Sequence, residues 1–97
     1  MDWPAPFVRI HDPEQQRGLA AELVRELAPT HELFGVPARA IGRRMDQDDV
    51  LFELTDGTGR VAEVHLTWQA NDRPPWPAAI VFASLEHWRI ARMKGEV

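Results

Sequence analysis

The fold is decided by residues 50–68, which read VLFELTDGTGRVAEVHLTW. Apolar and polar side chains alternate at both ends of this stretch, which is the pattern of two half-buried strands. Gly57 and Gly59 stand between them and supply the backbone freedom that a turn needs. The stretch therefore predicts a β-hairpin with one apolar face and one polar face.

The apolar pattern also predicts the register of this hairpin. A three-residue loop with Gly59 in the left-handed conformation pairs Leu54 with Ala62 and Phe52 with Val64. Both apolar rows then lie on one face, whereas a shift by one residue would turn an acidic side chain into the core. We therefore expect these pairs, with Trp68 on the core face at the end of the second strand.

The polar face of the predicted hairpin carries the first candidate site. In this register Glu53 faces Glu63 and Leu51 faces His65. Two facing carboxylates repel each other unless a metal ion, a shared proton or an arginine compensates them. Three arginines of the preceding segment are near in sequence: Arg39, Arg43 and Arg44. We expect one of these arginines to compensate the two carboxylates, so that the polar face is a solvated charge ladder. Glu53, Glu63 and His65 remain as weak catalytic candidates.

A histidine upstream of the hairpin is a fourth weak candidate. His31 lies in a turn at residues 30–35, and it meets His65 only if that turn folds over the sheet. Two histidines with Glu53 or Glu63 would resemble a zinc or hard-metal site. No spacing such as His-Glu-x-x-His supports that arrangement. We predict neither a metal nor a cofactor, and a structural, hydrogen-bonded His31.

Helix signals flank the hairpin region on both sides. Asp12 caps a helix that begins at Pro13, carries an apolar stripe and ends at Pro29. Ser84 caps a second helix that carries Trp88 and ends at Gly95. The apolar stripe of the first helix consists of Leu19, Ala20, Leu23, Val24 and Leu27.

The remaining segments complete an α+β fold. Residues 38–45 form a weak strand and residues 79–83 a fully apolar one, while the proline-rich residues 69–77 form a loop. Residues 1–11 form an arm that is either a short edge strand or extended chain. We predict one domain, residues 1–97, ordered α-β-β-β-β-α, with an antiparallel sheet of three to four strands and both helices on one face.

The composition excludes several function classes. The chain has 97 residues, 44% hydrophobic and 27% charged, a formal charge of −4 and no cysteine. Thiol chemistry and disulfides are therefore excluded, and the negative charge argues against nucleic-acid binding. The longest apolar run, from Ala78 to Ala83, is too short to cross a bilayer, and the first residues do not look like a secretory signal. We predict a cytoplasmic protein with no membrane partner.

Three segments together resemble a group of short bacterial proteins of unassigned function. They are a His-x-Leu-x-Gly turn at residues 31–35, an Asp-Asp-Val-Leu-Phe strand at residues 48–52 and a Val-His-Leu-Thr-Trp strand at residues 64–68. The resemblance runs from Thr30 to Trp88. It implies a bacterial, cytoplasmic origin and carries no activity, cofactor or catalytic residue.

Two functions are supported by features of the sequence, and a third, a small-ligand pocket between the sheet and the helices, is physically possible although no residue argues for it. The first is an interaction module that binds another protein or itself, as a homodimer paired through the apolar strand at residues 79–83. Trp3, Pro75 and Trp76 would line its partner groove, unless both rings pack onto their own domain. The second is a small metal-dependent enzyme or binder that uses Glu53, Glu63 and His65. Because the sequence holds no catalytic signature, we favour the interaction module over an enzyme.

Overall fold

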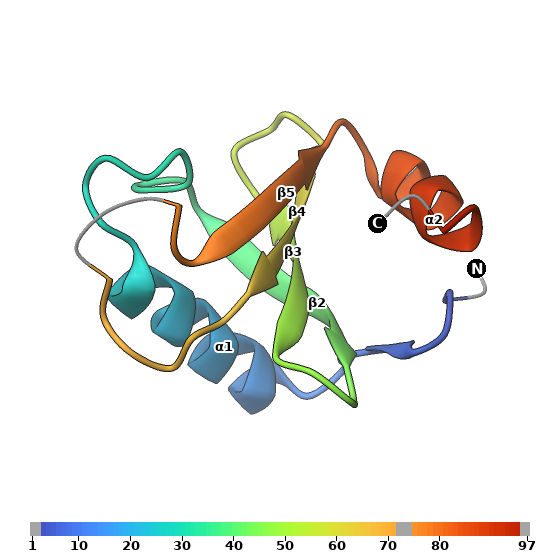
Figure 1. Ribbon diagram of the computed structural model, residues 1–97, viewed down its shortest axis with the longest axis horizontal. Helices are drawn as coiled ribbons and strands as arrows, with labels where there is room; N and C mark the ends of the chain where they lie inside the picture. Colours follow the sequence, from blue (N-terminus) through green and yellow to red (C-terminus); the bar gives the residue numbers. More distant parts are fainter. Residues whose placement is uncertain (1–2, 72–74, 96–97) are drawn as a thin grey trace.

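The computed structural model describes residues 3–71 and 75–95, so part of the predicted proline-rich loop, residues 72–74, lies outside it. It has an α+β fold, as predicted, with a five-stranded antiparallel sheet and two helices (Figure 1). In chain order the elements are β1 (Phe7–Arg9), α1 (Pro13–Glu26), β2 (Ala38–Arg44), β3 (Asp49–Leu54), β4 (Val61–His65), β5 (Ala78–Phe82) and α2 (Leu85–Met93).

The sheet has one strand more than the prediction of three to four. The strands lie side by side in chain order, from β1 at one edge to β5 at the other. The additional strand is β1, which belongs to the N-terminal arm and pairs with the end of β2. A strand of only three residues that directly follows Pro6 gives a weak signal in the sequence, so the arm was predicted to be either a short edge strand or extended chain.

Both helices begin where the capping signals place them. The Asp12 carboxylate accepts the amide of Glu14 at 3.0 Å at the start of α1, and Pro13 occupies the first turn. The Ser84 hydroxyl accepts the amide of His87 at 3.1 Å at the start of α2. Each side chain thus satisfies one of the amides that a helix start leaves without a partner.

The helices cover opposite faces of the sheet, which corrects the prediction that both lie on one face. On one side α1 packs on a core that includes Phe52 and Val64. On the other side Trp88 of α2 packs with Leu51 and Val61. Figure 1 shows α1 and α2 at opposite sides of the sheet. The physical reason is that β3 and β4 carry apolar residues on both faces, so each face needs a cover.

The side chains of the hairpin are divided between the two faces as predicted, but the face predicted to be polar and solvated is instead buried against α2, and the register also differs. Phe52 pairs with Ala62 and Val50 with Val64, so β3 is displaced by two residues from the prediction. The loop is longer because hydrogen bonds stabilise a turn inside it. Asp56 Oδ1 accepts the amide N–H of Thr58 at 3.1 Å and the hydroxyl of the same threonine at 2.6 Å. A displacement of two residues preserves which face each side chain occupies.

The end of the second hairpin strand also differs from the prediction. β4 ends at His65, and Trp68 is exposed, with a left-handed φ of 61°. The buried carboxylate of Glu26 causes this turn, since it accepts the amides of Thr67 and Trp68, each at 2.8 Å. These bonds draw the chain away from the sheet and toward the end of α1.

Candidate functional site

The two glutamates of the predicted polar face do not lie opposite each other. Glu53 faces Val61 and Glu63 faces Leu51. Glu53 is instead bound by Arg39 of the neighbouring strand, with 2.8 Å between guanidinium and carboxylate, on the exposed surface. An arginine of the preceding strand thus compensates this carboxylate, which is the alternative we expected.

Glu63 is buried between the sheet and α2. Its Oε1 accepts the indole N–H of Trp88 at 2.8 Å and the Nε–H of Arg92 at 3.0 Å. A second bond from Arg92 to Oε2 makes the ion pair bidentate, and the same guanidinium lies 4.9 Å from the centre of the Phe7 ring. The compensating arginine therefore comes from α2 and not from the three candidates before the hairpin. Every one of these contacts fixes α2 to the sheet.

His65 forms a pair that the sequence analysis did not find. Its Nδ1 lies 2.6 Å from Oδ1 of Asp49, the residue directly opposite it on β3. Asp49 is buried and also lies 3.9 Å from a guanidinium nitrogen of Arg44. A carboxylate that accepts Nδ1–H orients the ring and leaves Nε2 as the proton-accepting nitrogen on a half-exposed side chain. The correct hairpin register would have revealed this pair.

His31 is buried and uses both of its ring nitrogens. Nδ1 accepts the amide of Leu33 at 3.1 Å, so Nε2 carries the proton and donates it to the carbonyl of Pro77 at 2.9 Å. These bonds give His31 the structural role that the sequence suggested. Among the residues that the structure describes, no group of three or more His, Asp or Glu residues could hold a metal ion.

The residues proposed for a partner groove lie in two separate places. The Trp3 ring packs 5.3 Å from that of Trp88, centre to centre, in the core under α2. Pro75 lines a hollow of about 390 Å³ together with His31 and Ala79, and Trp76 is exposed. Trp3 therefore packs in the core under α2, whereas the hollow lined by Pro75 lies beside β5.

The hydrogen bonds of the hairpin show which residues of β4 direct their backbone N–H and C=O groups toward β3. The amide of Leu54 donates to the carbonyl of Arg60 at 3.0 Å, and that of Leu66 donates to the carbonyl of Asp48 at 2.9 Å. Even-numbered residues along β4 therefore point their backbone groups toward β3. Because this direction alternates along a strand, its odd-numbered residues bond to β5.

The same alternation leaves part of β5 without a strand partner. Glu63 of β4 lies opposite Ile80, so the even-numbered residues of β5 bond to β4. Ala79 and Val81 direct their N–H and C=O groups outward at the edge of the sheet, where no other described backbone group binds them. The preceding outward carbonyl, that of Pro77, is the one bound by His31.

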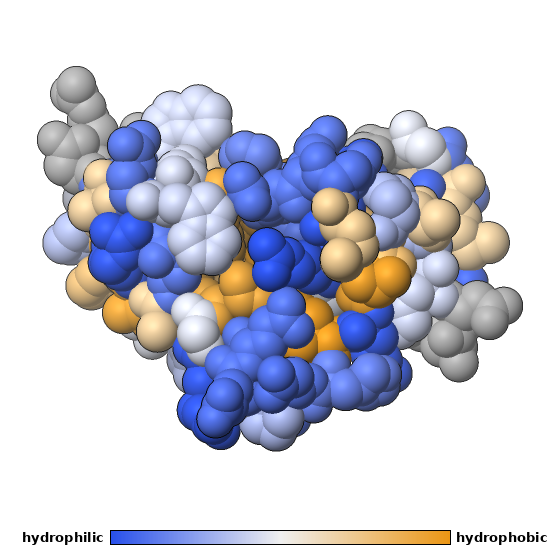
Figure 2. All heavy atoms as spheres, turned by 90° about the horizontal axis from the view of Figure 1, so that it is seen from below, coloured by the Kyte–Doolittle hydropathy of each residue, from blue (hydrophilic) through white to orange (hydrophobic). Residues whose placement is uncertain are grey.

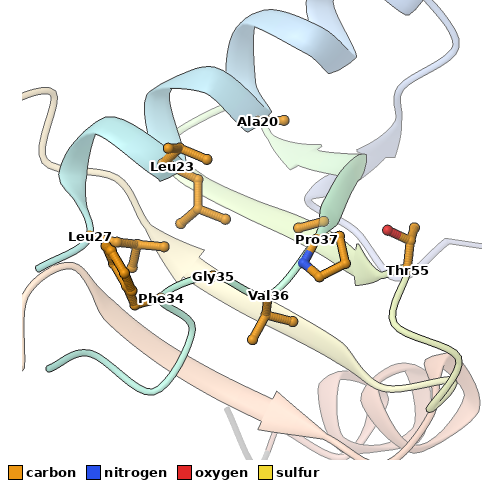
Figure 3. Close-up of a pocket in the computed structure, with 10 residues that line it drawn as sticks. Ala20, Leu23, Leu27, Phe34, Gly35, Val36, Pro37 and Thr55 are labelled. Carbon is orange, nitrogen blue, oxygen red and sulfur yellow. The ribbon is translucent and has the colours of Figure 1, made fainter. Parts of the chain in front are cut away.

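A second open feature is an apolar pocket beside α1 (Figure 3). Its volume is about 460 Å³. Leu23 of α1 and Leu27, which directly follows the helix, line one side, and Val36 and Pro37 of the segment before β2 line the other. Figure 2, which views the molecule from below, shows apolar surface left uncovered between polar side chains.

Comparisons with known proteins give no relative from which a function could be transferred. No family model, no curated protein and no solved structure matches the chain. Within residues 3–71 and 75–95, neither helix is long and apolar enough to cross a membrane. The features of the molecule that bear on its function are the β5 edge, the Asp49–His65 pair and the apolar pocket.

Proposed function

We propose that the chain is a bacterial, cytoplasmic interaction module that associates with a second copy of itself through the outer edge of β5. The observation that carries this proposal is the outward direction of the Ala79 and Val81 backbone groups at the end of the sheet. An open strand edge is a template for another strand, and pairing with an identical edge across a twofold axis satisfies both copies equally.

The outward residues specify the register of this pairing. Antiparallel strands that place Ala79 opposite Val81 of the second copy form hydrogen bonds at both ends of Ile80. Ile80 then lies on the twofold axis opposite Ile80 of the second copy, as a pair without mutual hydrogen bonds, whose side chains are closest. Ile80 is 47% exposed, so pairing would remove apolar surface from water.

The composition of the edge also favours association. Residues 78–82 read AAIVF and contain neither charge nor proline, which are the features that protect exposed strand edges. The capped carbonyl of Pro77 limits pairing at one end, and Ser84 begins α2 at the other. The available template is short and centred on Ile80.

Sedimentation velocity over a range of concentrations tests this proposal with two matched variants. Ile80→Lys places two ammonium groups together at the axis and is expected to weaken the dimer by at least about tenfold. Val8→Lys is the control, because Val8 is 45% exposed on the opposite edge strand, and it should dimerise like the wild type. A monomeric wild type at about 1 mM, or equal behaviour of the variants, would contradict the proposal.

The Asp49–His65 pair supports a second candidate function, a small enzyme or metal binder. A buried carboxylate that orients an exposed imidazole is the arrangement of a general base, and the unprotonated Nε2 could also ligate a metal. Zinc titration followed by the ¹⁵N signals of His65, with Asp49→Asn as the comparison, tests this. Unchanged Nε2 signals in the wild type would remove the metal-binding form of this candidate.

A further inference from the structure

The pocket beside α1 continues into a smaller hollow nearer the start of the helix. Ala20 and Ala38 line both spaces, so the two meet at these residues. The smaller hollow is lined by Arg17 and Arg39, whereas the larger one is almost entirely apolar, with Thr55 as its polar exception. Together they form one groove, which we name the α1 groove, with an apolar end and a cationic end.

The dimensions of the α1 groove suit a small elongated ligand. Arg17, Ala20 and Val24 recur at helical spacing on one side of α1, and Leu27 directly follows the last residue of the helix. From Arg17 to its last residue, Glu26, the helix rises by roughly 14 Å. The apolar part alone holds about 460 Å³, within the range of small-molecule sites, which combine mostly apolar walls with a few placed polar groups.

The contrast between the cationic end and the apolar end of the groove specifies the chemical character of the ligand. Arg39 is already paired with Glu53, whereas Arg17 makes no ion pair with any residue of ranges 3–71 and 75–95. The cationic end therefore has one positive charge in excess. At the other end lie Leu27 and the half-exposed Phe34 (Figure 3), where an apolar chain would cover both.

We propose that the α1 groove binds an aliphatic carboxylate, with the chain along Leu23, Leu27 and Phe34 and the carboxylate at Arg17. Guanidinium groups suit carboxylates because their fork of N–H donors matches the two oxygens. The apolar chain supplies most of the affinity and the charge selects the head group. This ligand site is separate from the β5 edge and does not depend on self-association.

Isothermal titration calorimetry with sodium decanoate tests the site, with 1-decanol and decyltrimethylammonium as matched ligands of other head groups. Decanoate should bind the wild type most tightly. Arg17→Gln should weaken it by about three- to fivefold at low salt, the size expected for an exposed ion pair. Arg25→Gln is the control on the same helix, since Arg25 pairs with Glu22 and does not line the groove.

A second variant tests the groove independently of charge. Ala20→Phe places a large ring where the two hollows meet and should weaken decanoate by at least about tenfold; unchanged circular dichroism and urea unfolding show that it still folds. If decanol binds as tightly as decanoate, or if Arg17→Gln and Arg25→Gln behave alike, the carboxylate assignment is overturned. If decanoate fails to bind the wild type, or if a folded Ala20→Phe binds it normally, the site itself is overturned.

Discussion

The two edges of the sheet differ in how they are protected. β1 has three residues and follows Pro4 and Pro6. The amide of Phe7 is bound by the carbonyl of Pro4 at 3.0 Å, and the guanidinium of Arg9 lies 6.0 Å from the centre of the Trp3 ring. Charge, proline and a local turn are the devices that prevent edge-to-edge pairing. The β1 edge therefore has the features of a terminated sheet.

The β5 edge has none of these devices along its five residues. Val8 and Ile80, one on each edge strand, are 45% and 47% exposed, so apolar exposure does not distinguish the edges. The distinction lies in the backbone, because Ala79 and Val81 offer two consecutive outward sites. A pair of edges in one small sheet thus provides an internal control for any test of association.

The largest effect on the β5 edge is expected from introducing proline, and it should differ between two neighbouring residues of the strand. Ile80→Pro removes an amide that bonds to β4 and leaves the Glu63 carbonyl without a donor, which should cost about 2–3 kcal/mol in the free energy of unfolding. Ala79→Pro removes only an outward amide and should cost less than about 1 kcal/mol while abolishing the dimer. Urea unfolding and sedimentation measure both quantities, and equal destabilisation by the two prolines would contradict the assigned backbone directions.

The β1 edge is tested by filling the space under Trp3. A Cβ added to Gly42 of β2 would lie 2.5 Å from Cζ3 of Trp3, so the ring would have to move. We expect Gly42→Ala to destabilise the protein by about 1–3 kcal/mol. Gly18→Ala on α1 is the control, since an added Cβ there meets nothing within 4 Å, and it should stabilise by about 0.5–1 kcal/mol. If urea unfolding shows that both variants change the free energy of unfolding in the same direction, this packing is contradicted.

The smallest effect concerns Glu26, which anchors the loop leading into β5. Burial raises the pKa of the Glu26 carboxyl, the hydrogen bond with Glu22 adds to the rise, and the bonds from Thr67 and Trp68 oppose it. A folded pKa above the unfolded value of 4.5 means that the unfolded chain ionises first. This contribution to stability is full below pH 4.5 and is lost as the pH rises through the folded pKa.

Glu26→Gln removes that contribution, because the amide does not titrate, together with the part of the lowered Glu22 pKa that the hydrogen bond with Glu26 causes. Subtracting the pH dependence of unfolding of this variant from that of the wild type should leave a decline in stability that begins near pH 4.5. Urea unfolding at a series of pH values provides the curves. A difference curve that rises over this range would show that the amides of Thr67 and Trp68 outweigh burial.

Local signals in the sequence were sufficient for much of the fold. The caps Asp12 and Ser84 act directly on helix starts, and the alternation in residues 50–68 correctly assigned Phe52 and Val64 to one face. The register was wrong because the turn that Asp56 forms with Thr58 lengthens the loop by side-chain hydrogen bonds, which periodicity does not record.

The rest could not be predicted because it depends on contacts that are distant in the chain. The position of α2 follows from Glu63, which binds Trp88 and Arg92 of that helix, and no local pattern indicates that this acid is buried. Asp49 meets His65 only in the correct register. The apolar strand at residues 79–83 was recognised, but the outward direction of alternate residues needed the hydrogen bonds of the whole hairpin.

Amide hydrogen exchange at single residues, followed by NMR at low and high protein concentration, tests the central claim most directly. The amides of Ala79 and Val81 should exchange rapidly when dilute and become protected as the concentration rises, while that of Ile80 should be protected throughout. Exchange at Ala79 and Val81 that stays rapid at every concentration would contradict pairing through β5.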